Sequence, residues 1–119
     1  MKLAISSLDG KFDTQFSSRF GRCESFIFID TETGDWEPKP NPATLTRGGA
    51  GAQVVQFLSA NGVEATISGR YGPTAFTALD AAGIQAFVAD SGTPEELLDK
   101  FQANELVQVN DATGPELHH

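Results

Sequence analysis

The sequence enters its first predicted helix through the stretch Arg47-Gly48-Gly49-Ala50-Gly51-Ala52-Gln53. Three glycines precede Val54-Val55-Gln56-Phe57-Leu58, a run with the apolar spacing of a helix. Glycine permits close approach of the backbone to a ligand, and a helix start offers unpaired N–H groups and partial positive charge to an anion. The stretch therefore fits either a plain strand-to-helix connection or an anion-binding loop, and the rest of the chain has to distinguish these two interpretations.

The composition restricts the class of protein. The 119 residues suffice for one domain with its own core. Sixteen acidic and eight basic residues give a net charge of −8, which argues against general binding of nucleic acids or anionic membranes. No apolar run approaches the ~20 residues of a membrane span, and the start of the chain turns polar at Ser6, too early for a signal peptide. A single cysteine excludes an internal disulfide, and we expect a cytoplasmic protein.

Apolar patterning predicts a single α/β domain over residues 1–109, followed by a flexible polar tail at 110–119. Strands are expected near residues 2–7, 25–30, 35–39, 64–68 and 84–89, with the second antiparallel to the first and the third a hairpin partner at an edge. Helices are expected to begin near Ala50, Pro73 and Pro94, the last through a capping box at Thr93. Residues 12–22 show no clean period and are predicted to be a loop. The result is a mixed five-stranded sheet with an antiparallel hairpin and helices packed on it.

The positive charges are placed unevenly along this predicted fold. The arginines are Arg19, Arg22, Arg47 and Arg70, and each lies beside a glycine or in a glycine-flanked segment. Ligands of open α/β sheets bind beyond the carboxyl ends of the strands, where the predicted topology puts Arg47 and Arg70. An acidic protein would then carry one local cationic pocket, whereas solvated surface arginines are the alternative.

A series of short motifs resembles a known family. In order, these are Phe20-Gly21-Arg22-Cys23, Asn41-Pro42, Gly48-Gly49-Ala50-Gly51, Ser68-Gly69-Arg70-Tyr71-Gly72-Pro73-Thr74-Ala75-Phe76 and Ala82-Gly83-Ile84. The series resembles the dinitrogenase iron–molybdenum cofactor biosynthesis family, which includes the NifX, NafY and NifB C-terminal type domains. The resemblance runs from the first strand to the third helix. It implies a ribonuclease-H-like α/β fold without ribonuclease activity, and a non-enzymatic protein that carries or stores a metal–sulfur cluster.

The resemblance also implies a ligand and partners. The ligand would be an anionic cluster of the iron–molybdenum type, or of the molybdenum–copper type that the related orange protein holds non-covalently, exchanged with a donor or acceptor protein. Guanidinium groups and glycine-loop N–H groups suit such an anion. The cofactor-binding candidates are therefore Arg19, Arg22, Cys23, Arg47, Gly48, Gly49, Ala50, Gly51, Gly69 and Arg70. Family members often have histidine at the position of Arg19, and this replacement favours electrostatic holding over coordination, because arginine has no lone pair to donate.

Two interpretations of Cys23 stay open. It is the candidate metal ligand, with a pKa that Arg19 and Arg22 would lower if the thiol were exposed, or it is a small buried residue. One cysteine cannot supply the four protein ligands of an ordinary iron–sulfur site. His118 and His119 could bind a metal as a pair or belong to a loose tail. Because both histidines are terminal, no Ser-His-Asp or Cys-His-carboxylate site can be assembled, and we expect no enzyme.

Two other functions use the same features. The glycine turns would also suit a nucleotide- or phosphate-binding regulatory module, although the chain lacks both the Gly-Lys-Ser/Thr phosphate loop and the Gly-x-Gly-x-x-Gly fingerprint. A protein-interaction domain with an acidic surface for a basic partner is the third possibility. The oligomeric state stays open.

The role of Cys23 can be tested directly. We predict that Cys23→Ser weakens the retention of a thiometallate without abolishing it, because the arginines and backbone amides remain. Metal content and visible absorption of the purified variant measure retention, and circular dichroism controls for folding. Complete loss of metal and colour with an unchanged dichroism spectrum would make Cys23 an obligatory ligand.

Overall fold

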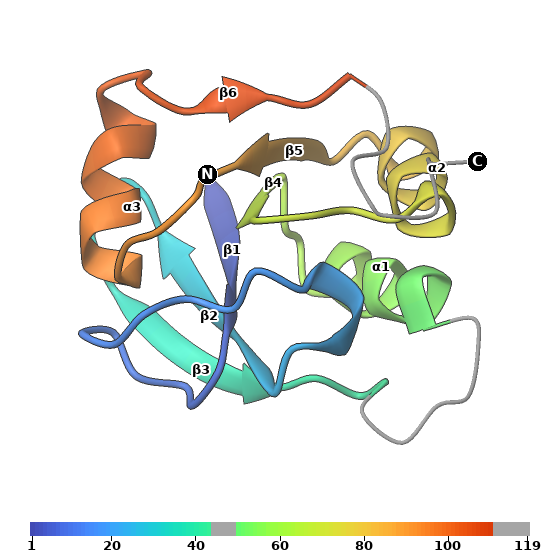
Figure 1. Cartoon of the computed structure of the whole chain (residues 1–119), viewed down its shortest axis with the longest axis horizontal. Coiled ribbons are helices and arrows are strands. Elements are labelled where there is room, and N and C mark those ends of the chain that lie inside the picture. The colour runs from blue at the N-terminus through green and yellow to red at the C-terminus, as the bar shows by residue number, and fades with distance from the viewer. Residues whose placement is uncertain (44–49, 111–119) are drawn as a thin grey trace.

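The computed structural model describes residues 1–43 and 50–110, which form one sheet flanked by helices (Figure 1). The elements are β1 (Lys2–Ser7), the 3-10 turn η1 (Phe20–Arg22), β2 (Ser25–Asp30), β3 (Trp36–Pro40), α1 (Ala50–Ala60), β4 (Ala65–Ser68), α2 (Pro73–Ala82), β5 (Gln85–Val88), α3 (Pro94–Gln102) and β6 (Val107–Gln108). Every strand and helix predicted from the sequence is present, with bounds that differ by no more than about one residue.

The sheet has the strand order β3-β2-β1-β4-β5-β6. β1 pairs antiparallel with β2 and parallel with β4, and β4 pairs parallel with β5, which confirms the predicted mixed sheet and the edge position of β3. The predicted count of five strands is wrong, because Val107–Gln108 adds a sixth strand antiparallel to β5. Two exposed residues are too few to show an alternating pattern, so this strand is recognised only by its pairing.

The sequence predicted a loop over residues 12–22, but the structure shows that this segment is not purely a loop. It contains η1, and it makes isolated β-bridges from Phe16 to Ser7 and from Arg19 to Arg70. A single 3-10 turn has no apolar repeat that a sequence pattern could reveal. These bridges place the segment at the carboxyl ends of β1 and β4.

Both faces of the sheet are covered. Successive residues of a strand point to opposite faces, so Leu3 packs in a cluster with Leu97 of α3, whereas Ala4 packs in a cluster with Val54 of α1 and Leu79 of α2. Figure 1 shows α3 on one side of the sheet and α1 and α2 on the other. Burial on both faces explains why β2 is apolar at successive positions. None of the helices described has the length and apolarity to cross a membrane.

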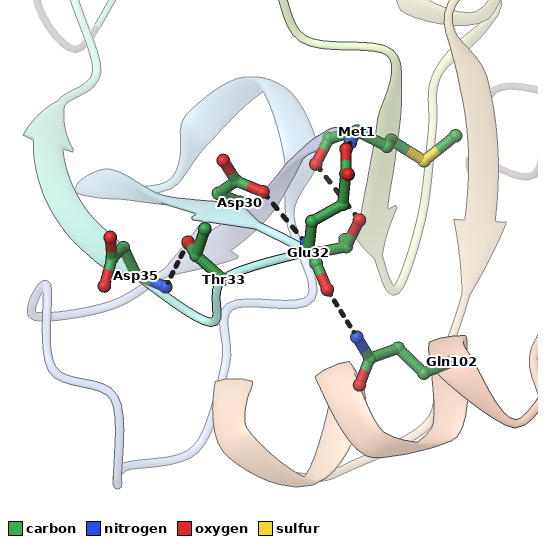
Figure 2. A network of polar contacts seen from close by, with 7 residues as sticks. Met1, Asp30, Glu32, Thr33, Asp35 and Gln102 are labelled. Carbon is green, nitrogen blue, oxygen red and sulfur yellow. Dashed lines mark hydrogen bonds and ion pairs between the residues drawn. The ribbon is translucent and has the colours of Figure 1, made fainter.

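The turn between β2 and β3 closes one end of the sheet, as Figure 2 shows. The amino group of Met1 forms an ion pair with Glu32 Oε2 at 3.2 Å, and Gln102 Nε2 of α3 donates to Thr31 O at 2.8 Å. Asp30 Oδ1 accepts a hydrogen bond from Glu32 N at 2.9 Å. Since Met1 precedes β1, these contacts occupy the amino end of the central strand and leave its carboxyl end for other contacts.

The capping box predicted at the start of α3 is present and can be tested. Thr93 Oγ1 accepts from Glu96 N at 3.2 Å, and Glu96 Oε1 accepts from Thr93 N at 2.9 Å. We predict that Thr93→Ala lowers the free energy of unfolding by about 1 kcal/mol, because an N–H of the first turn loses its acceptor. Urea unfolding measures the change. Thr77→Ala, at an exposed position of α2, should stay within about 0.5 kcal/mol of wild type. Equal losses in the two variants would contradict a specific cap.

Candidate functional site

Two arginines from distant parts of the sequence lie side by side beyond the carboxyl ends of β1 and β4. Arg19 and Arg70 form a parallel β-bridge, and Phe20 N donates to Arg70 O at 3.4 Å. Both arginines are exposed. Within residues 1–43 and 50–110, neither guanidinium group has an ion pair or a hydrogen bond. This edge of an acidic protein therefore carries two positive charges that no carboxylate within residues 1–43 and 50–110 pairs with.

Buried serines hold the Arg19 segment against the strand ends. Ser6 Oγ donates to Ser17 O at 2.5 Å and lies 2.8 Å from Ser68 Oγ, and Ser17 N donates to Ser6 O at 2.9 Å. All three serines are buried. Their hydroxyl groups are satisfied by one another and by the backbone, so the network fixes the segment in place. None of these serines was among the site residues predicted from the sequence, although Ser6 and Ser68 are polar residues at the ends of two apolar strands.

Gly69 allows this close approach. A Cβ atom on Gly69 would lie 2.6 Å from Ser18 Cβ and 2.9 Å from Ser18 Cα, closer than side chains can pack. The glycine that the sequence offered as a cofactor-binding residue is therefore required for packing between the β4–α2 turn and the Arg19 segment.

The start of α1 lies between η1 and α2. A Cβ atom on Gly21 of η1 would lie 3.9 Å from the N and Cα atoms of Gly51, and a Cβ atom on Gly51 would lie 3.0 Å from Ala75 of α2. Figure 1 shows η1, in blue, beside α1. The first N–H groups of a helix lack acceptors within the helix and carry partial positive charge. Two helix starts therefore lie at the same edge as the arginine pair.

Cys23 follows η1 and lies in the core. Its side chain is 1% exposed, and Sγ donates to Phe20 O at 3.5 Å and accepts from Asn41 Nδ2 at 3.8 Å. Burial raises the pKa of the Cys23 thiol to about 12. The exposure that would let the arginines lower this pKa is absent. The structure thus gives Cys23 the buried environment of the second interpretation, and its role as a metal ligand stays a prediction.

Of the remaining candidate site residues, some lie within the described part of the chain and others lie outside it. Arg22 ends η1 as an exposed residue, and Ala50 begins α1 and is buried. Arg47, Gly48 and Gly49 lie outside the described residues, as do His118 and His119, and their roles stay predictions. Among the residues that the structure describes, no group of three or more His, Cys, Asp or Glu side chains could hold a metal ion. The edge is suited to hydrogen bonding and charge attraction to an anion.

Comparison with known proteins finds similar chains over nearly the whole length. The model of the family described as dinitrogenase iron-molybdenum cofactor matches residues 1–104. An uncharacterized protein from Methanocaldococcus jannaschii is 28% identical over 97 residues, which cover 79% of this chain and 82% of that protein.

Two solved structures are similar in fold. The apo form of the orange protein from Desulfovibrio gigas superposes with a TM-score of 0.91 at 28% identity, covering 95% of this chain and 96% of that one. The NMR structure of a NifB candidate protein from Thermotoga, placed in the DUF35 family, has a TM-score of 0.83 at 35% identity, covering 96% and 97% of the two chains.

The packing role of Gly69 predicts a loss of stability on substitution. Gly69→Ala should lower the free energy of unfolding by about 1–3 kcal/mol, because the backbone at Ser18 has to move away from the new methyl group. Gly21→Ala is the matched control, since among the described residues its Cβ atom would meet nothing closer than 3.9 Å. Urea unfolding of both variants measures the difference. A Gly69→Ala protein as stable as wild type would contradict the close contact.

Proposed function

Because the chain belongs to the dinitrogenase iron–molybdenum cofactor family, we propose that it binds an anionic metal–sulfur cluster and carries or stores it. The cluster is cargo of the iron–molybdenum type or another molybdenum-containing type. The observation that carries the proposal is the pair of exposed guanidinium groups of Arg19 and Arg70 at one edge of the sheet. The site is this edge, together with the adjacent starts of α1 and α2.

The overall charge makes a local site necessary. With a net charge of −8, the protein as a whole repels an anion, so binding requires positive groups gathered in one place. Arg19 and Arg70 supply this concentration of charge, and each offers several N–H donors in a planar group. A hydrogen bond to a charged group contributes about 1.5–3 kcal/mol, and the upper part of that range applies when the ligand excludes water.

The hydrogen-bond donors of the site suit a cluster whose metal ions are already coordinated by inorganic sulfide. The arginines and the backbone N–H groups of the helix starts donate hydrogen bonds, and Cys23 is buried with a raised pKa. Such a site holds the outer sulfur atoms of a thiometallate by charge and hydrogen bonds and leaves the metal–sulfide bonds intact. Where these contacts alone hold the cluster, release to an acceptor protein breaks no bond between protein and metal.

The proposal has four narrower parts, which concern catalysis, the fold motif, the partner and the location. The chain acts as a binding protein and not as an enzyme, since both of its histidines are terminal and its one thiol lies in the core. An antiparallel hairpin followed by two strand–helix units supports a ribonuclease-H-like motif. A donor or acceptor protein is the partner, and the single cysteine fits a cytoplasmic location.

The test is titration with tetrathiomolybdate, followed by visible absorption under anaerobic conditions. Arg19→Ala and Arg70→Ala should each weaken binding by about tenfold to a hundredfold, because each removes a charged donor. Arg47→Ala is expected to weaken it to the same extent. Raising the salt concentration should weaken binding to the wild-type protein, because exposed charges are screened.

The control is Lys100→Ala, at an exposed position of α3. It changes the net charge by the same amount as the arginine variants and should leave the affinity unchanged. Equal affinities in wild type and all variants would rule out the arginine edge as the site. ATP and inorganic phosphate are titrated in parallel. Binding of either one without binding of tetrathiomolybdate would favour the nucleotide- or phosphate-binding module.

A further inference from the structure

We propose that Asn41 is a positioning residue, which holds η1 and thereby Arg19 in the arrangement that binds the anion; the inference rests on the function proposed for that edge. Asn41 immediately follows β3 and is 2% exposed. Its side-chain hydrogen bonds go to Gly21, Cys23 and Ala43 and to neither guanidinium group of the arginine pair, so its effect on the ligand passes through the backbone of η1.

The side-chain amide of Asn41 connects residues 21–23 to the residues that follow β3. Nδ2 donates to Cys23 O at 2.9 Å and to Gly21 O at 3.5 Å, and Oδ1 accepts from Ala43 N at 2.9 Å. The backbone N of Asn41 donates to Glu24 O at 3.1 Å. The residue therefore ties the end of η1 and the residues after it to the segment that follows β3.

The Arg19 segment is anchored on both sides of η1. Upstream, Ser6 binds Ser17 O and Arg19 pairs with Arg70; downstream, Asn41 supplies the side-chain anchor. Within η1, Arg22 N donates to Arg19 O at a long 3.3 Å, and the Arg19 side chain makes no capping hydrogen bond at the start of the turn. A single 3-10 turn has poor hydrogen-bond geometry and depends on its surroundings. Loss of the downstream anchor would leave Arg19 held on its upstream side alone, and we expect its position relative to Arg70 to become less fixed.

Asn41→Asp distinguishes a role of Asn41 in hydrogen bonding from a role in packing alone. Asn41→Asp keeps the shape and the acceptor for Ala43 N, but it turns a carboxylate oxygen towards two carbonyl oxygens, which repel it. Asn61→Asp is the matched control: Asn61 Nδ2 also donates to a backbone carbonyl, that of Phe57 at 2.8 Å, at the far end of α1. Asn41→Ser, which retains a short acceptor and cannot reach Cys23 O, is the second variant if the aspartate protein does not fold.

The first readout needs no ligand. Cys23 is the only cysteine of the chain and is buried beside η1, so its rate of reaction with Ellman's reagent reports how often the turn opens. A carboxylate at residue 41 would lie beside Sγ and would itself disfavour the reactive thiolate, so a faster reaction indicates opening of the turn. We expect at least a tenfold faster reaction, roughly, in Asn41→Asp than in wild type or Asn61→Asp, because buried hydrogen bonds are lost. Urea unfolding of both variants shows whether a general loss of stability explains the rate. A rate unchanged from wild type would overturn the inference.

The second readout is tetrathiomolybdate affinity in a double-mutant cycle with Arg19→Ala. Asn41→Asp should weaken binding by about tenfold, as is typical when a group that orients a ligand-binding residue is removed. The double variant should bind no more weakly than the weaker single variant, because both substitutions disable the same guanidinium group. Fully additive losses would show that Asn41 does not act through Arg19 and would overturn the positioning role.

The outcomes separate this inference from the proposed function. If Arg70→Ala weakens binding and Asn41→Asp does not, the proposed function stands and the positioning role is overturned. If the wild-type protein does not bind tetrathiomolybdate, the proposed function is overturned and the positioning role falls with it.

Discussion

The close packing of residues 17–23 against the carboxyl ends of β1 and β4 is the contact on which the candidate site depends. Gly69 lets the backbone at Ser18 approach, and the buried Ser6 hydroxyl binds Ser17 O at 2.5 Å. A substituent on Gly69 would force these backbones apart. Arg19 and Arg70 are neighbours only because this packing is present, since about fifty residues separate them in the sequence.

The charge distribution follows from the same packing. An acidic surface keeps most anions away, and the edge with Arg19 and Arg70 is the exception that the fold creates. In the part of the chain that the structure describes, neither arginine forms an ion pair with a carboxylate. An anion bound at this edge would therefore attract both groups without displacing an existing ion pair from the described residues.

The burial of Cys23 affects how the proposed cluster would be held, because a thiol in the core is not presented to a ligand at the surface. The thiol contributes to packing beneath η1, where its pKa is raised to about 12, and it is not presented to solvent. A thiolate bond to a metal would make transfer slow unless an acceptor displaced it. Charge and hydrogen bonds alone permit release by screening or by competition, which suits a protein that carries a cluster between partners.

The sequence by itself determined the positions of β1 to β5 and of α1 to α3. These features rest on local signals: apolar periodicity, the capping box at Thr93 and the turn glycine Gly83, whose φ of 72° matches the predicted helix end. Local signals also identified Arg70 as a residue beside a glycine turn, but they could not identify Arg19 as its neighbour in space. Only the tertiary structure decided that Arg19 pairs with Arg70, that Cys23 is buried, that Gly69 is needed for packing, and that a sixth strand exists. The physical reason is that each of these features is a contact between segments far apart in sequence, and contacts of that kind leave no repeat along the chain for a pattern to detect.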